Sequence, residues 1–155
     1  MKKYFFLFIS LLFFSCSGKR PENLGPSVQI INGVGKVTLL PCPQKPNCVS
    51  SYKDFNDKDR FLEPIEIHST KERAYEKISK MILKDKNATP VSMIDNYIHA
   101  EYVSPLLKFV DDVEFYFGEK GFIHFRSASR IGYHDLGANK KRIEEIRFKF
   151  HQNDF

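Results

Sequence analysis

Arginine, serine and aspartate residues suited to binding an anion are concentrated in the second half of the chain. Segment 126–130 alternates guanidinium groups with hydroxyls, and segment 139–142 adds cations where a helix is expected to begin. Guanidinium groups, hydroxyls and helix N-termini are the groups that bind phosphate or carboxylate. The candidate residues of this polar cluster or anion-binding site are Asp111, Asp112, Arg126, Ser127, Ser129, Arg130, Asp135, Asn139 and Arg142.

The same residues also allow a purely structural interpretation. Asp111, Asp112 and Asp135 supply enough negative charge to neutralise the arginines of the cluster. Such ion pairs would hold the loop between the last strand and the last helix in place. Guanidinium groups lining an open cleft would favour the anion site, whereas a carboxylate beside each arginine would favour the network. The sequence leaves both interpretations open.

No catalytic or metal-binding motif accompanies the cluster. The 5 histidines are not spaced as paired metal ligands, and the sequence contains no Gly-x-Ser-x-Gly nucleophile turn. A Ser-His-Asp arrangement can be imagined from Ser127 or Ser129 with His134 and Asp135. We therefore predict no catalytic residue, no metal site and no cofactor, and a hydrolase is the least favoured alternative.

The hydrophobic pattern predicts the elements that must position these residues. Alternating apolar residues mark strands, and apolar residues repeated every three to four positions mark amphipathic helices. Strands are expected at 65–68, 91–94, 97–104, 109–117 and 121–129, and helices from a capping-box pattern at 69–72 and at 140–151. Asn139 is the candidate N-cap of the second helix. The fold class is α+β, a single domain with an antiparallel sheet of about five strands and two amphipathic helices in the order β-α-β-β-β-β-α.

The last expected hairpin has one apolar and one charged face. Because successive side chains of a strand point to opposite faces, the register should join apolar face to apolar face. The charged face then carries acid–base pairs between strands, with Asp112 and Glu114 across from His124 and Arg126. The apolar face ends in a polar group of Asp111, Ser127 and Ser129.

Aromatic residues are abundant along the predicted sheet and second helix. The residues concerned are Tyr97, Tyr102, Phe109, Phe115, Phe125, Phe148 and Phe150. Helix-on-sheet folds of this order often enclose an apolar ligand between sheet and terminal helix, but the same residues also make an ordinary core. A cavity of a few hundred cubic ångströms, on the order of known ligand pockets, would favour the first interpretation. A filled core with an exposed apolar patch would favour a partner protein.

The N-terminus has the pattern of an exported lipoprotein. Lys2 and Lys3 precede an apolar run at 4–14, and Cys16 follows a small residue. The run would form only about 16 Å of helix, which is too short to span a bilayer. A cysteine at this position resembles the lipobox nucleophile that receives diacylglycerol. We predict a signal peptide at 1–15, a lipidated flexible tether at 16–27 with its lipid on Cys16, and one globular domain at 28–155.

The expected location and the charge limit the partners. Ser17 after the acylated cysteine resembles the signal for transfer to the outer membrane, so we expect a lipid-anchored envelope protein facing the periplasm. The formal charge of +5 falls to +3 once Lys2 and Lys3 leave with the signal peptide. No basic stripe with stacking aromatics is present, which argues against nucleic acid. The expected partners are the membrane through the N-terminal lipid, a small apolar or anionic ligand, and an envelope protein.

Two cysteines remain once Cys16 carries lipid. Cys42 and Cys48 flank a proline-rich segment, and an even pair in an oxidising compartment is the disulfide candidate. Free thiols and a zinc site are the alternatives, although a single cysteine pair supplies only half of a zinc ligand set.

Three segments together resemble a known family. They are CPQKPNCVSS at 42–51, FVDDVEF at 109–115 and RSASRIGYHDLGANKKR at 126–142. Their order and content resemble the domain-of-unknown-function family numbered 1499. The resemblance implies a globular domain of bacterial exported and membrane-associated proteins, and it implies no activity.

These patterns favour a lipid-anchored envelope protein that acts as a non-catalytic binding module for a small apolar or anionic ligand. The alternative is a structural lipoprotein or one that binds another envelope protein. A cavity under the C-terminal helix would separate the two.

Overall fold

The structure, a computed structural model, describes residues 28–31, 34–37, 39–52 and 58–152. The predicted signal peptide at 1–15 and the tether at 16–27, with its lipidation site Cys16, lie outside the described residues. Among the described residues, no helix has the length and apolar character needed to cross a membrane.

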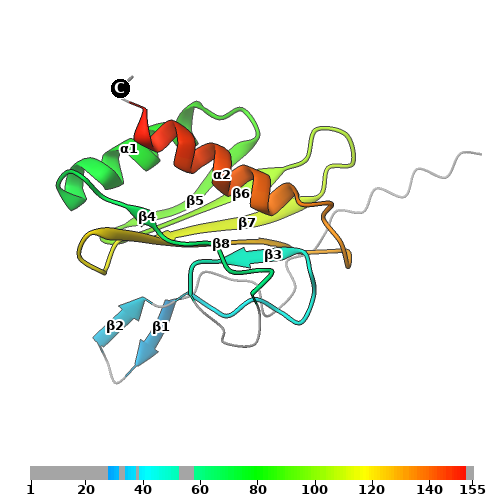
Figure 1. The fold of residues 1–155 in the computed structure, drawn as a ribbon, viewed down its shortest axis with the longest axis horizontal. Helices are drawn as coiled ribbons and strands as arrows, with labels where there is room; N and C mark the ends of the chain where they lie inside the picture. Colours follow the sequence, from blue (N-terminus) through cyan, green and yellow to red (C-terminus); the bar gives the residue numbers. More distant parts are fainter. Residues whose placement is uncertain (1–27, 32–33, 38, 53–57, 153–155) are drawn as a thin grey trace, which may run out of the picture.

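An antiparallel six-stranded sheet forms the body of the protein (Figure 1). Its main path runs β3-β8-β7-β6-β5, and β4 pairs with β8 off this path. The strands are β3 (Cys48–Ser50), β4 (Ile65–Glu66), β5 (Ala88–Ile94), β6 (Tyr97–Val103), β7 (Val110–Tyr116) and β8 (Phe122–Ser129). With α1 (Lys71–Lys84) and α2 (Ala138–His151), the chain from β4 onward has the predicted order β-α-β-β-β-β-α. The predicted fold class is therefore confirmed.

Three strands precede the region where strands were expected. β3 is short and follows a proline-rich segment, so alternation could not reveal it. β1 (Val28–Ile31) and β2 (Val34–Val37) form a separate two-stranded antiparallel sheet. The disulfide candidate is formed, since Cys42 and Cys48 are bonded with their Cα atoms 5.7 Å apart.

Helix α1 begins one residue later than the predicted capping box. Thr70 is its N-cap, and its hydroxyl accepts a hydrogen bond from the backbone N–H of Arg73 at 3.3 Å. The helix buries Ala74, Ile78 and Ile82 along the predicted stripe. This spacing places one apolar face against the sheet.

Helix α2 corrects the prediction that Asn139 is its N-cap. The N-cap is Gly137, which adopts a left-handed backbone with φ of 79°. The capping hydrogen bonds come from Asp135 instead, whose carboxylate accepts from the backbone N–H groups of Gly137 at 3.1 Å and Asn139 at 2.8 Å. A carboxylate there also opposes the positive end of the helix dipole.

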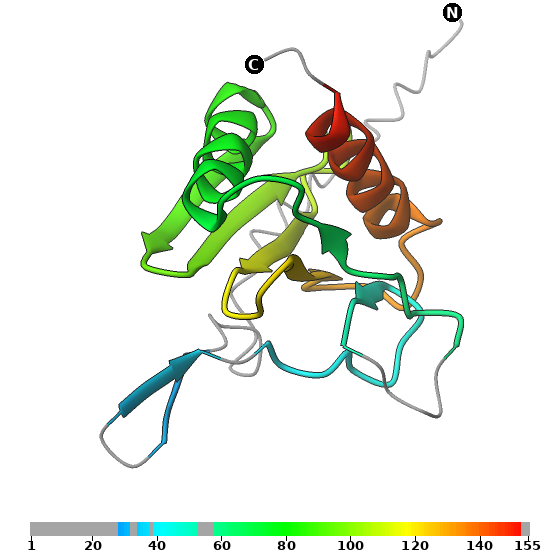
Figure 2. The ribbon, with the colours of Figure 1, turned by 60° about the vertical axis from the view of Figure 1, so that its left-hand side comes forward.

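Both helices cover the same face of the sheet, as Figure 2 shows. The core lies between these two layers and is filled by apolar side chains from both. Of the predicted aromatics, Tyr102, Phe115, Phe125 and Phe150 belong to this core. Tyr97 is buried on the other face of the sheet, whereas Phe109 and Phe148 are exposed. The aromatics are thus divided between core and surface.

The β7–β8 hairpin keeps the predicted faces. Glu114 lies opposite Arg126, as expected for a charged cross-strand pair. Asp112 lies opposite Ala128 and His124 opposite Tyr116, so the remaining acid–base pairing predicted for this face is wrong. The register is set by the apolar face, where Phe115 meets Phe125 across the strands.

Candidate functional site

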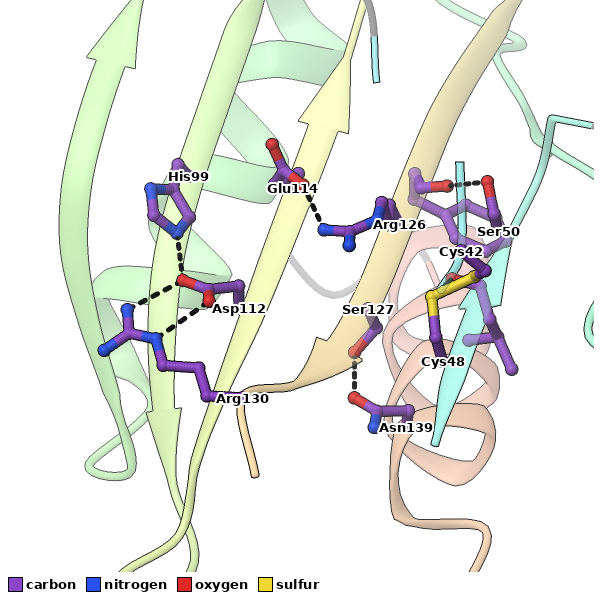
Figure 3. A network of polar contacts seen from close by, with 12 residues as sticks. Cys42, Cys48, Ser50, His99, Asp112, Glu114, Arg126, Ser127, Arg130 and Asn139 are labelled. Carbon is purple, nitrogen blue, oxygen red and sulfur yellow. Dashed lines mark hydrogen bonds and ion pairs between the residues drawn. A yellow bond between two sulfur atoms is a disulfide. The ribbon is translucent and has the colours of Figure 1, made fainter. Parts of the chain in front are cut away.

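The predicted polar residues divide between the two faces of the sheet. Because side chains alternate along a strand, Asp111 and Ser127 point to the helix side while Asp112 and Arg126 point away from it. The structure therefore makes two clusters where the sequence suggested one. Figure 3 shows part of each from close by: Ser127 and Asn139 on the helix side, and His99, Asp112, Glu114, Arg126 and Arg130 on the other.

On the helix side, a polar cluster is centred on the fully buried Asn139. Its amide group donates to the Ser129 hydroxyl at 2.9 Å, to the Asp135 carboxylate at 2.8 Å and to the backbone carbonyl of Asn47 at 3.0 Å. Its carbonyl accepts from the Ser127 hydroxyl at 2.6 Å. We call the whole set the Asn139 cluster: Asn47, Asp111, Ser127, Ser129, Asp135, Asn139 and Arg142.

Arg142 closes this cluster at the end of the core. Its guanidinium donates to Asp111 at 2.5 Å and to the Asn139 carbonyl at 2.7 Å. It also lies 4.9 Å from the ring centroid of Tyr102, a favourable cation–π position. Burial, assisted by the negative charge of Asp85, raises the pKa of Tyr102 to about 12. The cluster therefore joins α2 to β7, β8 and the segment before β3.

The opposite face of the sheet carries a second group of charged residues. We call it the outer-face cluster: Tyr97, His99, Glu101, Asp112, Glu114, Arg126 and Arg130. Arg130 donates two hydrogen bonds to Asp112, both at 2.8 Å, and pairs with Glu101. The His99 ring nitrogen Nε2 lies 2.7 Å from Asp112. Although burial alone would favour protonation, the hydrogen bonds from Arg130 and His99 lower the pKa of Asp112 to about 2.

Arg126 and Glu114 form the other half of the outer-face cluster. Their charged groups are 3.0 Å apart, and each side chain is only 1% exposed. The Tyr97 hydroxyl donates to the second oxygen of Glu114 at 2.5 Å. Within the described part of the chain, the Nε atom of Arg126 has no hydrogen-bond partner.

The arginines of both clusters lie beside carboxylates. Arg126 pairs with Glu114, Arg130 with Asp112, and Arg142 with Asp111. An anion would have to displace one of these carboxylates to bind there. Each arginine therefore has a carboxylate beside it, as the network interpretation expected, but Glu114 takes the place of Asp135, which caps α2 instead.

The imagined Ser-His-Asp arrangement is not assembled. Ser127 is bonded to Asn139 and Arg142, whereas the His134 ring lies edge-on to Tyr133 at 4.9 Å. Across the described ranges, no group of three or more His, Cys, Asp or Glu side chains is placed to hold a metal ion.

A different serine–histidine contact was missed by sequence reasoning. The Ser51 hydroxyl lies 3.1 Å from Nδ1 of His124, whose Nε2 lies 2.7 Å from Glu119. The same hydroxyl accepts from the backbone N–H of Phe125 at 2.8 Å, and Ser51 is only 3% exposed. Because its oxygen is buried and already bonded to the backbone, this contact pins the end of β3 to β8.

A groove between the start of α1 and the end of α2 was also missed. Its volume is about 530 Å³, within the usual range for ligand sites. The groove residues are His68, Ser69, Arg73, Glu76, Lys77, Lys80, Phe150 and His151. Arg73, Lys77 and Lys80 follow each other at helical spacing along one side of α1, which was the only sequence sign of this site.

The lining of the groove is mainly basic and includes the aromatic ring of Phe150. Lys77 lies 5.5 Å from the ring centroid of Phe150 and donates to the carbonyl of Gln152 at 2.5 Å. Glu76 is the one carboxylate of the lining, and it pairs with Lys80 at 2.7 Å. Burial, and then the nearby charges of His68 and Arg147, lower the pKa of His151. Apart from the two histidines, three of the four ionisable side chains that line the groove are cationic.

The fold and these clusters define a class of α+β domain, in which two helices cover one face of an antiparallel sheet and ion pairs are buried on the other. The chain belongs to the family described as "Protein of unknown function (DUF1499)", which matches residues 38–150. The comparisons found no matching curated protein and no matching solved structure.

Proposed function

We propose that the protein is a lipid-anchored, non-catalytic binding module of the cell envelope whose ligand site is the groove between α1 and α2. The ligand is a small anionic molecule with an apolar part. The observation that carries this proposal is the lining of the groove, where Arg73, Lys77 and Lys80 occur together with Phe150 and Lys77 lies over the Phe150 ring.

The chemistry of the lining supports an amphiphilic anion. Ammonium and guanidinium groups bind phosphate or carboxylate through charge-assisted hydrogen bonds. Phe150 offers an apolar surface to the uncharged part of the same ligand. The α1 N-terminus adds partial positive charge at the Ser69 end of the groove.

The other polar groups support binding less well than the groove does. The Asn139 cluster and the outer-face cluster are largely buried and hold their arginines against their own carboxylates. Breaking such pairs costs several kcal/mol, on the order of 3–5 for a buried pair. We therefore assign these clusters to stability and the groove to ligand binding.

Calorimetric titration of the full chain tests the groove. The probes are a short-chain lysophosphatidic acid and the monoacylglycerol with the same acyl chain. We expect the acid to bind and the neutral lipid to bind much more weakly. The double variant Arg73→Gln/Lys80→Gln should lower affinity about tenfold, at roughly threefold for each exposed charge.

Lys86→Gln is the matched control, because it removes one exposed positive charge just beyond the other end of α1. Its affinity should stay within about twofold of the wild type. Equal affinity of the wild type and Arg73→Gln/Lys80→Gln, or equal binding of the two lipids, would rule out the groove as an anion site.

A partner protein is the second candidate, and one observation favours it. Phe148 is 66% exposed on α2, in a shallow apolar hollow that Glu144 and Arg147 also line. Exposed aromatic residues are typical of protein interfaces. Phe148→Ser should then remove a co-purifying envelope protein while leaving lysophosphatidic acid binding unchanged.

The anchor is tested at the N-terminus. Mass measurement of the mature protein should find an acylated Cys16 as its first residue. Cys16→Ser should lose the lipid and leave the membrane fraction in a high-salt wash that retains the wild type. An intact Met1 in the membrane fraction would contradict the lipoprotein proposal.

A further inference from the structure

Two loops leave the same end of the sheet. One joins β6 to β7, the other joins β8 to α2, and the start of β7 and the end of β8 are neighbours in the sheet. The backbone N–H of Arg130, just after β8, donates to the carbonyl of Val110 at 3.1 Å. Both loops are visible at the right-hand end of the sheet in Figure 1.

The tips of these loops are apolar and face solvent. Leu136 is 99% exposed, Leu106 is 87% exposed and Leu107 is 63% exposed. Phe109 and Tyr133 are also exposed. We call these five residues the loop-tip surface. They lie outside the hydrophobic core, so burial on folding does not explain them.

Two residues at the loop tips have a backbone conformation that is uncommon for their residue type. Leu136 has φ of 55° and Lys108 has φ of 56°, in the left-handed region that glycine and asparagine adopt most easily. A γ-branched residue at such a position, with almost no contact to the rest of the protein, gives the fold no advantage. A leucine there is better explained by a contact made outside the chain.

We propose that the loop-tip surface docks onto a lipid bilayer with anionic headgroups. The leucines enter the boundary between headgroups and acyl chains, where exposed apolar side chains are stabilised. Lys108 lies between Leu107 and Phe109, and Lys140 and Lys141 follow in the exposed first turn of α2. These lysines fall at the depth of phosphate headgroups, and anionic lipid attracts them.

The charges on these loops fit a bilayer better than a protein partner. The nearby carboxylates of Asp111, Asp112 and Asp135 are already bonded to arginines or to the helix N-terminus. Lys141 lies 3.9 Å from the exposed Glu145, so Lys108 and Lys140 supply the net positive charge at the tips. The apolar residues lie on two separate loops, and Lys108 interrupts the apolar residues of one loop, whereas protein interfaces centre on a continuous apolar patch.

Docking this end would orient the rest of the domain. Helix α2 begins beside the loop tips and ends at the groove, and its 14 residues span about 21 Å. The groove lined by Phe150 and His151 therefore opens at the end remote from the bilayer. This consequence does not depend on the groove binding a ligand.

The chain contains no tryptophan, so a single introduced tryptophan reports on its own surroundings. We would place it in turn at Leu107 and at Leu136, as Leu107→Trp and Leu136→Trp. The control is Ile94→Trp, because Ile94 is 49% exposed in the wild type and is the last residue of β5, at the other end of the sheet. Each full-length variant is reconstituted into vesicles of phosphatidylglycerol and phosphatidylethanolamine, with and without brominated acyl chains.

We expect blue-shifted emission and strong quenching by brominated lipid at positions 107 and 136, and neither effect at position 94. Quenching at all three positions to the same extent, or at none, would overturn the proposal. A blue shift in native membranes without quenching by brominated lipid would indicate a protein on this surface and would also overturn it.

A second variant measures the contribution of the leucines without a new side chain. Leu106→Ser/Leu107→Ser/Leu136→Ser should weaken binding of Cys16→Ser protein to the same vesicles by roughly tenfold per leucine. Ile94→Ser in the same background should change it by less than about threefold. Equal loss in both variants, or unchanged binding when phosphatidylcholine replaces phosphatidylglycerol, would contradict docking to anionic lipid.

Discussion

The buried pair of Glu114 and Arg126 gives the sharpest test of how the sheet is held together. Arg126→Met keeps most of the side-chain volume but removes the guanidinium that faces Glu114 at 3.0 Å. At this separation and an effective dielectric constant of about 20, the attraction is about 5 kcal/mol. Because both side chains are 1% exposed, Glu114 would be left charged and buried. We expect the free energy of unfolding to fall by about 3–5 kcal/mol.

Urea denaturation of the wild type, the two single variants and the double variant measures the interaction energy between Glu114 and Arg126. Glu114→Gln keeps an oxygen that can accept from the Tyr97 hydroxyl while removing the charge. The double variant Arg126→Met/Glu114→Gln should therefore regain most of the lost stability and lie within about 2 kcal/mol of the wild type. A cost below about 1 kcal/mol for Arg126→Met, or simple additivity of the two changes, would refute the reasoning.

The same logic gives further predictions. Asp112 has a pKa of about 2 in the folded protein against an ordinary 3.8, so its ionised form adds about 2 kcal/mol to the free energy of unfolding at neutral pH, and this is lost as the pH falls from 4 toward 2. In Asp112→Asn the free energy of unfolding should therefore fall less steeply over this pH range, and an unchanged slope would contradict this. Reducing the Cys42–Cys48 bond should lower the free energy of unfolding by about 2 kcal/mol, whereas Cys42→Ser/Cys48→Ser should then be insensitive to reductant. The pKa of His151 lies below its ordinary value, so proton NMR should find the His151 ring neutral at pH 7. Bound lysophosphatidic acid should raise this pKa, and a pKa that stays the same at saturating lipid would contradict ligand binding in the groove.

Alternation along the sequence was enough to predict the central hairpin. The apolar residues of β7 and β8 recur every second position, so the two faces and the polar end at Asp111, Ser127 and Ser129 followed directly. The pairing of Asp112 with Arg130 did not follow, because that contact joins the third residue of β7 to the residue just beyond β8. A long arginine side chain reaches past its nearest cross-strand neighbour.

The parts of the site that sequence patterns did not predict depend on contacts between segments far apart in the chain. Asn139 was read as a helix cap, but its amide is held by the carbonyl of Asn47, 92 residues earlier. The groove depends on the start of α1 and the end of α2 lying side by side. Periodicity within α1 placed Arg73, Lys77 and Lys80 on one side of the helix but could not show what lay opposite them.

The most direct test of the central claim is native mass spectrometry of the protein purified in mild detergent from its own envelope. The proposed function predicts a small anionic amphiphile bound to the wild type and absent from Arg73→Gln/Lys80→Gln, with the wild type and the variant equally folded. A protein partner in place of a small ligand, or the same small ligand retained by both variants, would contradict the assignment of the groove between α1 and α2 as the binding site.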